Sequence, residues 1–147
     1  MTAVDRGSQR ATVGVADTHS YGLRVTTSLH VEDAEARIRE ALSAEGFGVL
    51  TEIDRAATLH AKLAIDMAPY TILDACRPPL AAQAVLAEPD VGLLLPCNVV
   101  VYAADDHTVV AALDPLTMVE LTGQANLQPV AEDARARLER ALTAVAV

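Results

Sequence analysis

The sequence predicts a single α+β domain in which helices cover a mixed, mainly antiparallel sheet. Segments with strand-like alternation are interleaved with segments of helical period, and the predicted order is β-α-β-α-β-α-β-β-α-α. Two successive strands are separated only by the turn at Asp105-Asp106, which predicts a hairpin. A hairpin within a series of βα units implies a mixed sheet, and 147 residues suit one domain with a proper core.

The first part of the chain predicts a tail, a strand and a helix. Residues 1–20 mix small, polar and charged side chains without a period, so we expect a flexible tail and a domain over residues 21–147. The β-rich segment Gly22 to Ser28 predicts the first strand. A helix over about 31–45 follows, with Gly46 at its end. Its apolar face contains Val31, Ala34, Ile38, Ala41 and Leu42.

The middle of the chain predicts two strands and two helices. Phe47 to Asp54 alternates as a half-buried strand, and Arg55 to Ile65 predicts a short helix. Tyr70 to Cys76 predicts the third strand, and Pro78-Pro79 suits the first turn of a helix that ends near Ala87. In the Phe47 strand we expect one face to carry Phe47, Val49, Thr51 and Ile53.

The second half begins with a long apolar run. Pro89-Asp90 predicts a turn, and Gly92 to Tyr102 predicts a buried strand interrupted at Pro96, which cannot donate a ladder hydrogen bond. Thr108 to Leu113 predicts the next strand. Asp114-Pro115 predicts the N-cap and first position of a short helix ending near Gly123. The last helix opens at Pro129, with Val130, Ala134, Leu138, Leu142 and Val145 on one face.

Composition excludes several classes of partner. The net charge is −9, which repels nucleic-acid backbones and anionic membranes, and only 3% of the residues are aromatic. No apolar run approaches the roughly 20 residues that a membrane-spanning helix needs. Two cysteines are too few for a disulfide scaffold, and residues 1–20 lack the apolar core of a signal peptide. We therefore expect a cytoplasmic protein with reduced thiols, and neither a nucleic-acid nor a membrane partner.

Several motifs resemble a known family. They are the segment EGFGVLTEID at 45–54, the segment PYTILDAC at 69–76 with Pro78, the run from Gly92 through Tyr102, and Asp114-Pro115. From Gly22 to about Ala144 the chain resembles domain-of-unknown-function family 302, found in bacteria and archaea. The resemblance implies a two-layer α/β sandwich, a homodimer and no accepted activity. The family commonly has Asn where this chain has Arg77, which cannot accept a helix-capping hydrogen bond.

Cys76 and Cys97 are the first candidate site residues. Each lies beside a proline at the end or interruption of an apolar strand, so two neighbouring strands would bring both sulfurs to one pocket. Such a thiol pair suits redox chemistry or a soft metal. The alternative is that both pack as small hydrophobic side chains, as free cysteines commonly do. No spacing of Cys, His and Asp recommends a metal site, and no particular cofactor is implied.

The other candidates surround these cysteines. Tyr70 and Asp74 alternate along the third strand, where Asp74 could meet Arg77, cap a helix, line a pocket or lie in water. Asn98 could bind a ligand or satisfy backbone groups that Pro96 leaves unpaired. The candidate ligand-binding or redox residues are therefore Cys76, Cys97, Asp74, Asn98, Tyr70 and Arg77.

Two functions from different classes fit these residues. The first is a non-enzymatic, dimeric binding or interaction module with a small-molecule pocket near Cys76 and Cys97. The second is a thiol-based redox or soft-metal-binding protein that uses the same pair. The sequence contains neither a phosphate-binding glycine loop nor a nucleophile elbow, so it favours the non-enzymatic interpretation.

Overall fold

The architecture follows from a computed structural model that describes residues 21–95 and 97–146. The predicted tail over residues 1–20 and the predicted role of Pro96 lie outside the described residues. The order of helices and strands agrees with the sequence prediction. The elements are β1 (Gly22–Thr27), α2 (Val31–Ala44), β2 (Gly48–Asp54), α3 (Arg55–Leu63), β3 (Tyr70–Cys76), α4 (Pro78–Ala87), the 3₁₀ helix η1 (Pro89–Leu94), β4 (Cys97–Ala104), β5 (His107–Leu113), α5 (Leu116–Thr122), the 3₁₀ helix η2 (Ala125–Leu127) and α6 (Gln128–Thr143).

The five strands form one open sheet in the order β1-β5-β4-β3-β2. The α+β class and the layer of helices on a sheet are confirmed, but all four strand pairings are antiparallel. The parallel pairing that a mixed sheet requires is therefore absent among the described strands. The connections through α3 and through α4 join neighbouring antiparallel strands, whereas α2 connects β1 to β2 at the opposite edge of the sheet. The hairpin predicted around Asp105-Asp106 is confirmed as β4 and β5.

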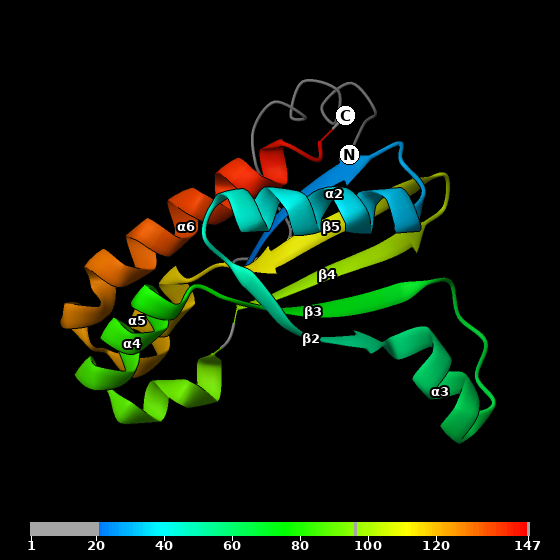
Figure 1. Ribbon diagram of the computed structural model, residues 1–147. Helices are drawn as coiled ribbons and strands as arrows, with labels where there is room; N and C mark the ends of the chain where they lie inside the picture. The colour runs from blue at the N-terminus through cyan, green and yellow to red at the C-terminus, as the bar shows by residue number, and fades with distance from the viewer. Residues whose placement is uncertain (1–20, 96, 147) are drawn as a thin grey trace.

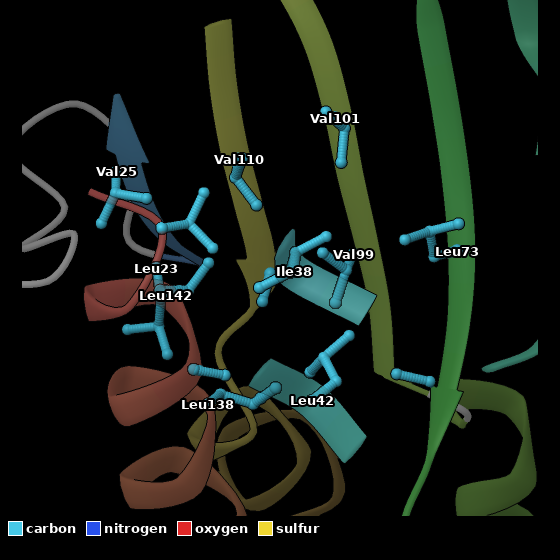
Figure 2. Packing of buried hydrophobic residues seen from close by; sticks show 14 of the residues in the cluster. Leu23, Val25, Ile38, Leu42, Leu73, Val99, Val101, Val110, Leu138 and Leu142 are labelled. Carbon is cyan, nitrogen blue, oxygen red and sulfur yellow. The ribbon is translucent and has the colours of Figure 1, made fainter. Parts of the chain in front are cut away.

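Helices α2 and α6 lie on the same face of the sheet (Figure 1). Their apolar faces meet the inward side chains of the strands, as the sequence periodicity predicts. Figure 2 shows Ile38 of α2 beside Val99 of β4, and Leu138 and Leu142 of α6 near Leu23 of β1. We call this cluster the sheet core. Its almost fully buried side chains include Leu23, Ile38, Leu42, Leu73, Val99, Val101, Val110, Leu138 and Leu142.

A second apolar cluster lies beyond one end of the sheet, where α4, α5 and the first turns of α6 gather (Figure 1). We call it the end cluster; its buried members are Leu80, Ala84, Val91, Met118, Leu127, Val130, Ala131 and Ala134. The helix α6 serves both clusters, because Val130 and Ala134 belong to the end cluster and Leu138 and Leu142 to the sheet core. All four face inward, so the predicted apolar face of this helix is confirmed.

The first part of the Gly92 run contradicts the predicted strand. Pro89 to Leu94 forms a 3₁₀ helix, and the amide of Leu95 donates to the carbonyl of Gly92 at 3.3 Å. Proline suits a first helical turn, so this local structure replaces both the predicted Pro89-Asp90 turn and the strand before Cys97. The expected burial of the run is also wrong at Leu93, which is 88% exposed.

Strand β2 differs from its predicted half-buried pattern. It is the edge strand, and six of its seven residues are exposed. A register shift between Val49 and Thr51 leaves Leu50 without a partner in β3, which marks a β-bulge. Beyond the bulge, Thr51 pairs with Asp74, so Thr51 and Ile53 do not share the face of Val49. An extra residue reverses the alternation, which explains why the predicted common face is wrong.

The predicted ends of α2 and α5 hold within one residue, whereas α3 ends at Leu63, before the predicted Ile65, and α6 ends at Thr143, before the predicted Val145. Helix α2 ends at Ala44, and Gly46 follows in the left-handed region with φ of +87°. Asp114 accepts a hydrogen bond from the amide of Leu116 at 3.0 Å, so it caps the start of α5 as expected. Gly123, with φ of +67°, ends that helix.

Candidate ligand-binding site

A half-open cavity of about 220 Å³ lies between the end of the sheet and helix α4. Its walls come from the two apolar clusters, since Phe47, Ala75 and Cys97 belong to the sheet core and Leu80, Ala84 and Met118 to the end cluster. Most of the lining is apolar, and the lining residues with polar or ionisable side chains are Arg77, Cys76 and Cys97. The remaining lining residues are Leu50, Ala81, Val85, Gly92, Leu95, Val130 and Ala134.

Adjacent strands bring the two cysteines to this cavity. Strands β3 and β4 are neighbours, and Cys97 at the start of β4 pairs with Ala75 of β3. Cys76 is the next residue and the last of β3, immediately before the chain turns into α4. The bulge in β2 adds Leu50 to the same wall. The sequence condition that neighbouring strands place both cysteines at one pocket is therefore met.

The two thiols differ in environment. Cys97 is 7% exposed, whereas Cys76 is half-buried, and both are free. Burial, with a smaller repulsion from Cys76, raises the pKa of the Cys97 thiol to about 11. At neutral pH Cys97 is therefore a neutral, weakly polar part of the wall, and its sulfur is a poor nucleophile.

Arg77 separates the third strand from α4. Its carbonyl accepts hydrogen bonds from the amides of Leu80 and Ala81, both at 3.0 Å, while no side chain caps the helix. The loss of a side-chain cap is the consequence expected of arginine at this position. The Nε atom of Arg77 is buried without a hydrogen-bond partner in the described part of the chain. It passes so close to Gly46 that a Cβ there would lie 2.9 Å from Nε.

The other three sequence candidates lie along the face of the sheet that points away from the sheet core. Asp74 pairs in register with Asn98 and accepts a hydrogen bond from the hydroxyl of Thr51, not from Arg77. Tyr70 stacks on Tyr102 with ring centroids 5.3 Å apart. None of Asp74, Asn98 and Tyr70 lines the cavity. The structure thus brings together Cys76, Cys97 and Arg77 at one place and separates them from the remaining candidates.

Sequence analysis did not identify the helical side of the cavity. The residues that it missed come chiefly from α4 and α6, and three of them are Ala81, Ala84 and Ala134. The available signal was the alanine-rich composition of α4 (PPLAAQAVLA), because small side chains between packed helices leave unfilled volume. That composition does not show which of the alanines line a cavity.

The described residues offer neither a metal cluster nor a membrane helix. Within residues 21–95 and 97–146, no three His, Cys, Asp or Glu side chains are arranged to hold a metal ion. No helix in the same part of the chain is both long and apolar enough to cross a bilayer.

Comparisons with known proteins agree with this fold. The family model described as "Domain of unknown function DUF302" matches residues 23–145. Among solved structures, the chain is similar to an uncharacterized conserved DUF302 protein from Bacillus stearothermophilus, with a TM-score of 0.80 and 30% sequence identity. The similarity covers 86% of this chain and 98% of that one. No curated protein matches the sequence.

Proposed function

The chain belongs to the DUF302 family, and from this premise we propose that it is a non-enzymatic, dimeric binding module. Its ligand is a small apolar molecule held in the cavity beside Cys76 and Cys97. The cavity itself carries this proposal, because nearly all of its lining is apolar while it opens to solvent on one side. The two free thiols favour a reducing compartment, so the proposal includes a cytoplasmic location.

Binding of octan-1-ol, a neutral apolar probe, tests this function by calorimetry. Filling the cavity with Ala134→Leu should weaken binding at least tenfold, because Ala134 lines it. Ala141→Leu, two turns further along α6 and in the sheet core, is the matched control and should leave the affinity unchanged. Failure of the wild-type protein to bind the probe would contradict the proposal.

The redox or soft-metal function is the second candidate, and the shared cavity wall of Cys76 and Cys97 is the observation that favours it. The raised pKa of Cys97 weakens it, since the thiolate is the reactive and metal-binding form. A Cys76→Ser, Cys97→Ser double variant separates the two functions. We expect it to bind octan-1-ol within about twofold of wild type, because serine roughly conserves the shape of the wall. If a function later found for the chain is lost in this variant while probe binding persists, the thiol-based alternative is preferred.

We propose that a second copy of the chain covers the sheet face opposite α2 and α6. This face carries Ile72, Val100 and the stacked pair Tyr70 and Tyr102, all partly buried. Five strands spaced about 4.8 Å apart present a face of roughly 500 Å² in projection, which is of the same order as the ~800 Å² per partner of a standard interface.

Sedimentation of the full chain tests the dimer. The expected mass is twice the 15.5 kDa of one chain, and Val100→Glu should convert it to a monomer by burying a charge in the interface. Leu93→Glu is the control, because Leu93 is exposed on η1 at the cavity end. A wild-type monomer would contradict the proposed dimer. A dimer that is lost in Leu93→Glu but not in Val100→Glu would show that the interface lies on another surface.

A further inference from the structure

Arg77 is a charged side chain of the cavity wall that lacks a counter-ion in the described residues. Its Nε is buried and has no hydrogen-bond partner within residues 21–95 and 97–146. Several other arginines have carboxylate partners, as Arg135 has Asp114 at 3.2 Å. A guanidinium carries five N–H donors and stays charged at any physiological pH, so removing part of it from water without an acceptor is unfavourable.

The carboxylate beside Gly46 is already engaged. Glu45 precedes Gly46, the residue that Arg77 packs against, but its oxygens bind Arg140 at 2.9 and 3.1 Å. Arg137 lies 3.8 Å from the same carboxylate. Glu45 therefore pairs with two other arginines, and a counter-ion for Arg77 has to come from outside the described chain.

The position of Arg77 depends on this particular sequence. Gly46 has no Cβ, which leaves the space through which the Arg77 side chain passes. The strand end at Cys76 and the proline pair that opens α4 fix the backbone on both sides of Arg77. The Arg77 side chain is thus held in a wall whose other residues are apolar or cysteine.

The cavity also limits the size of a ligand. A closed cavity of about 150 Å³ in a protein core accommodates benzene. The volume of about 220 Å³ here suits an apolar body of about six to eight carbons. Because Arg77 is the one charged residue of the lining, we expect the ligand to carry a single anionic group.

We propose that the cavity binds a monocarboxylate with an apolar body of about six to eight carbons, whose carboxylate pairs with Arg77. This inference rests on the proposed function, since it names the ligand class of the same cavity. A planar carboxylate matches the two parallel donors of a guanidinium. The net charge of −9 opposes an anion only weakly, because charges beyond about 8 Å are screened at physiological ionic strength.

Octanoate and octan-1-ol form a matched pair of probes, since both have eight carbons and only octanoate is charged at pH 7. We expect calorimetry on the full chain to give at least about tenfold tighter binding of octanoate, as a charge-assisted hydrogen bond supplies. Arg77→Met keeps the length and apolar stem of the side chain, and it should remove this preference while binding octan-1-ol within about twofold of wild type. Arg77→Lys should retain part of the preference, and Arg37→Met, at an exposed position of α2, should retain all of it.

The outcomes separate the ligand class from the existence of a ligand site. Equal binding of both probes by wild type, or an unchanged preference in Arg77→Met, would overturn the role of Arg77 and leave the apolar site intact. Loss of both probes in Arg77→Met would also overturn it, because Arg77 would then only support the wall. If wild type binds neither probe, the proposed function itself fails and this inference with it.

Discussion

The sheet core and the end cluster are built from the same kinds of side chain but packed to different degrees. In the sheet core, leucine, isoleucine and valine from the strands meet α2 and α6, and Leu73, Val99 and Leu138 are fully buried (Figure 2). Alanine makes up a larger share of the end cluster, and a cavity of about 220 Å³ separates part of that cluster from the sheet. Helix α6 crosses both, so the contrast is present along a single helix.

The difference indicates a division of roles within one domain. Dense packing stabilises the fold, because each buried side chain loses water and gains dispersion contacts. A cavity gives up some of those contacts and provides volume for a ligand. If this comparison is correct, equivalent substitutions in the two clusters should have different effects on stability.

Truncation of a leucine should produce the largest difference. Leu138→Ala in the sheet core should lower the free energy of unfolding by about 2–5 kcal/mol, since Leu138 is fully buried. Leu80→Ala should cost about 1–2 kcal/mol, because Leu80 already borders the cavity and has fewer neighbours to lose. Urea denaturation of both variants measures the difference, and equal losses would contradict the contrast.

The second test adds side-chain volume instead of removing it, at two alanines of α6. Ala141→Leu should lower the free energy of unfolding by about 1–3 kcal/mol, because the sheet core has no room for the added carbons. Ala134→Leu should change it by less than about 1 kcal/mol, since the new side chain enters the cavity. The two positions are seven residues apart on one helix, so helix propensity is matched. A large loss in Ala134→Leu would mean that the cavity does not accommodate the side chain.

The pH dependence of stability reports on the boundary between the two clusters. Burial raises the pKa of Cys97 to about 11 from 9.0, so the folded state retains a proton that the unfolded chain loses. The stability associated with this thiol is therefore complete below pH 9 and is lost as the pH rises through 11. At pH 10 the loss is about 1 kcal/mol.

The control for this titration is Cys97→Ala. Denaturation at pH 8 and pH 10 should show a smaller fall for the variant, because the other titrating groups are common to both proteins. The same fall in both proteins would show that Cys97 is not the group responsible.

The smallest effect is expected where α6 meets the end of α2 at the surface. The hydrogen bond from Arg140 is the main reason that the pKa of Glu45 lies below its usual range, and the stability from this pair is therefore present at neutral pH and lost as the pH falls through the lowered pKa. Arg140 is solvent-exposed, so Arg140→Gln should be nearly neutral at pH 7. NMR titration of Glu45 in this variant should show a higher pKa than in wild type, and an unchanged value would exclude Arg140 as the cause.

Patterns within each segment allowed much of the fold to be predicted. Strand alternation, helical period and capping residues located the helices and strands in order, because these signals are short-range. Two errors came from tertiary context. The apolar run at Gly92 begins as a 3₁₀ helix, and the bulge at Leu50 breaks the alternation of an edge strand. Apolar character alone does not distinguish these structures from buried strands.

The candidate site was predicted in part. The prolines beside Cys76 and Cys97 drew attention to both residues, and Arg77 stood out as a departure from the family pattern. No sequence pattern separated these three residues from Tyr70, Asp74 and Asn98. Strand alternation places Cys76 on the same face as Tyr70 and Asp74, so it does not separate them. Only the packing of α4 at the end of the sheet decides which of these residues borders the cavity.

The sequence by itself determined the α+β class, the order of the elements, the apolar face of α6 and the pair of cysteines that end up as neighbours. The tertiary structure decided the antiparallel order of the described strands and the cavity between the two clusters. It also decided that Nε of Arg77 has no partner in the described part of the chain. Local propensities act over a few residues and can be read from the chain. Cavities and missing counter-ions depend on which distant segments meet, and in this protein small alanines from α4 and α6 meet the end of the sheet.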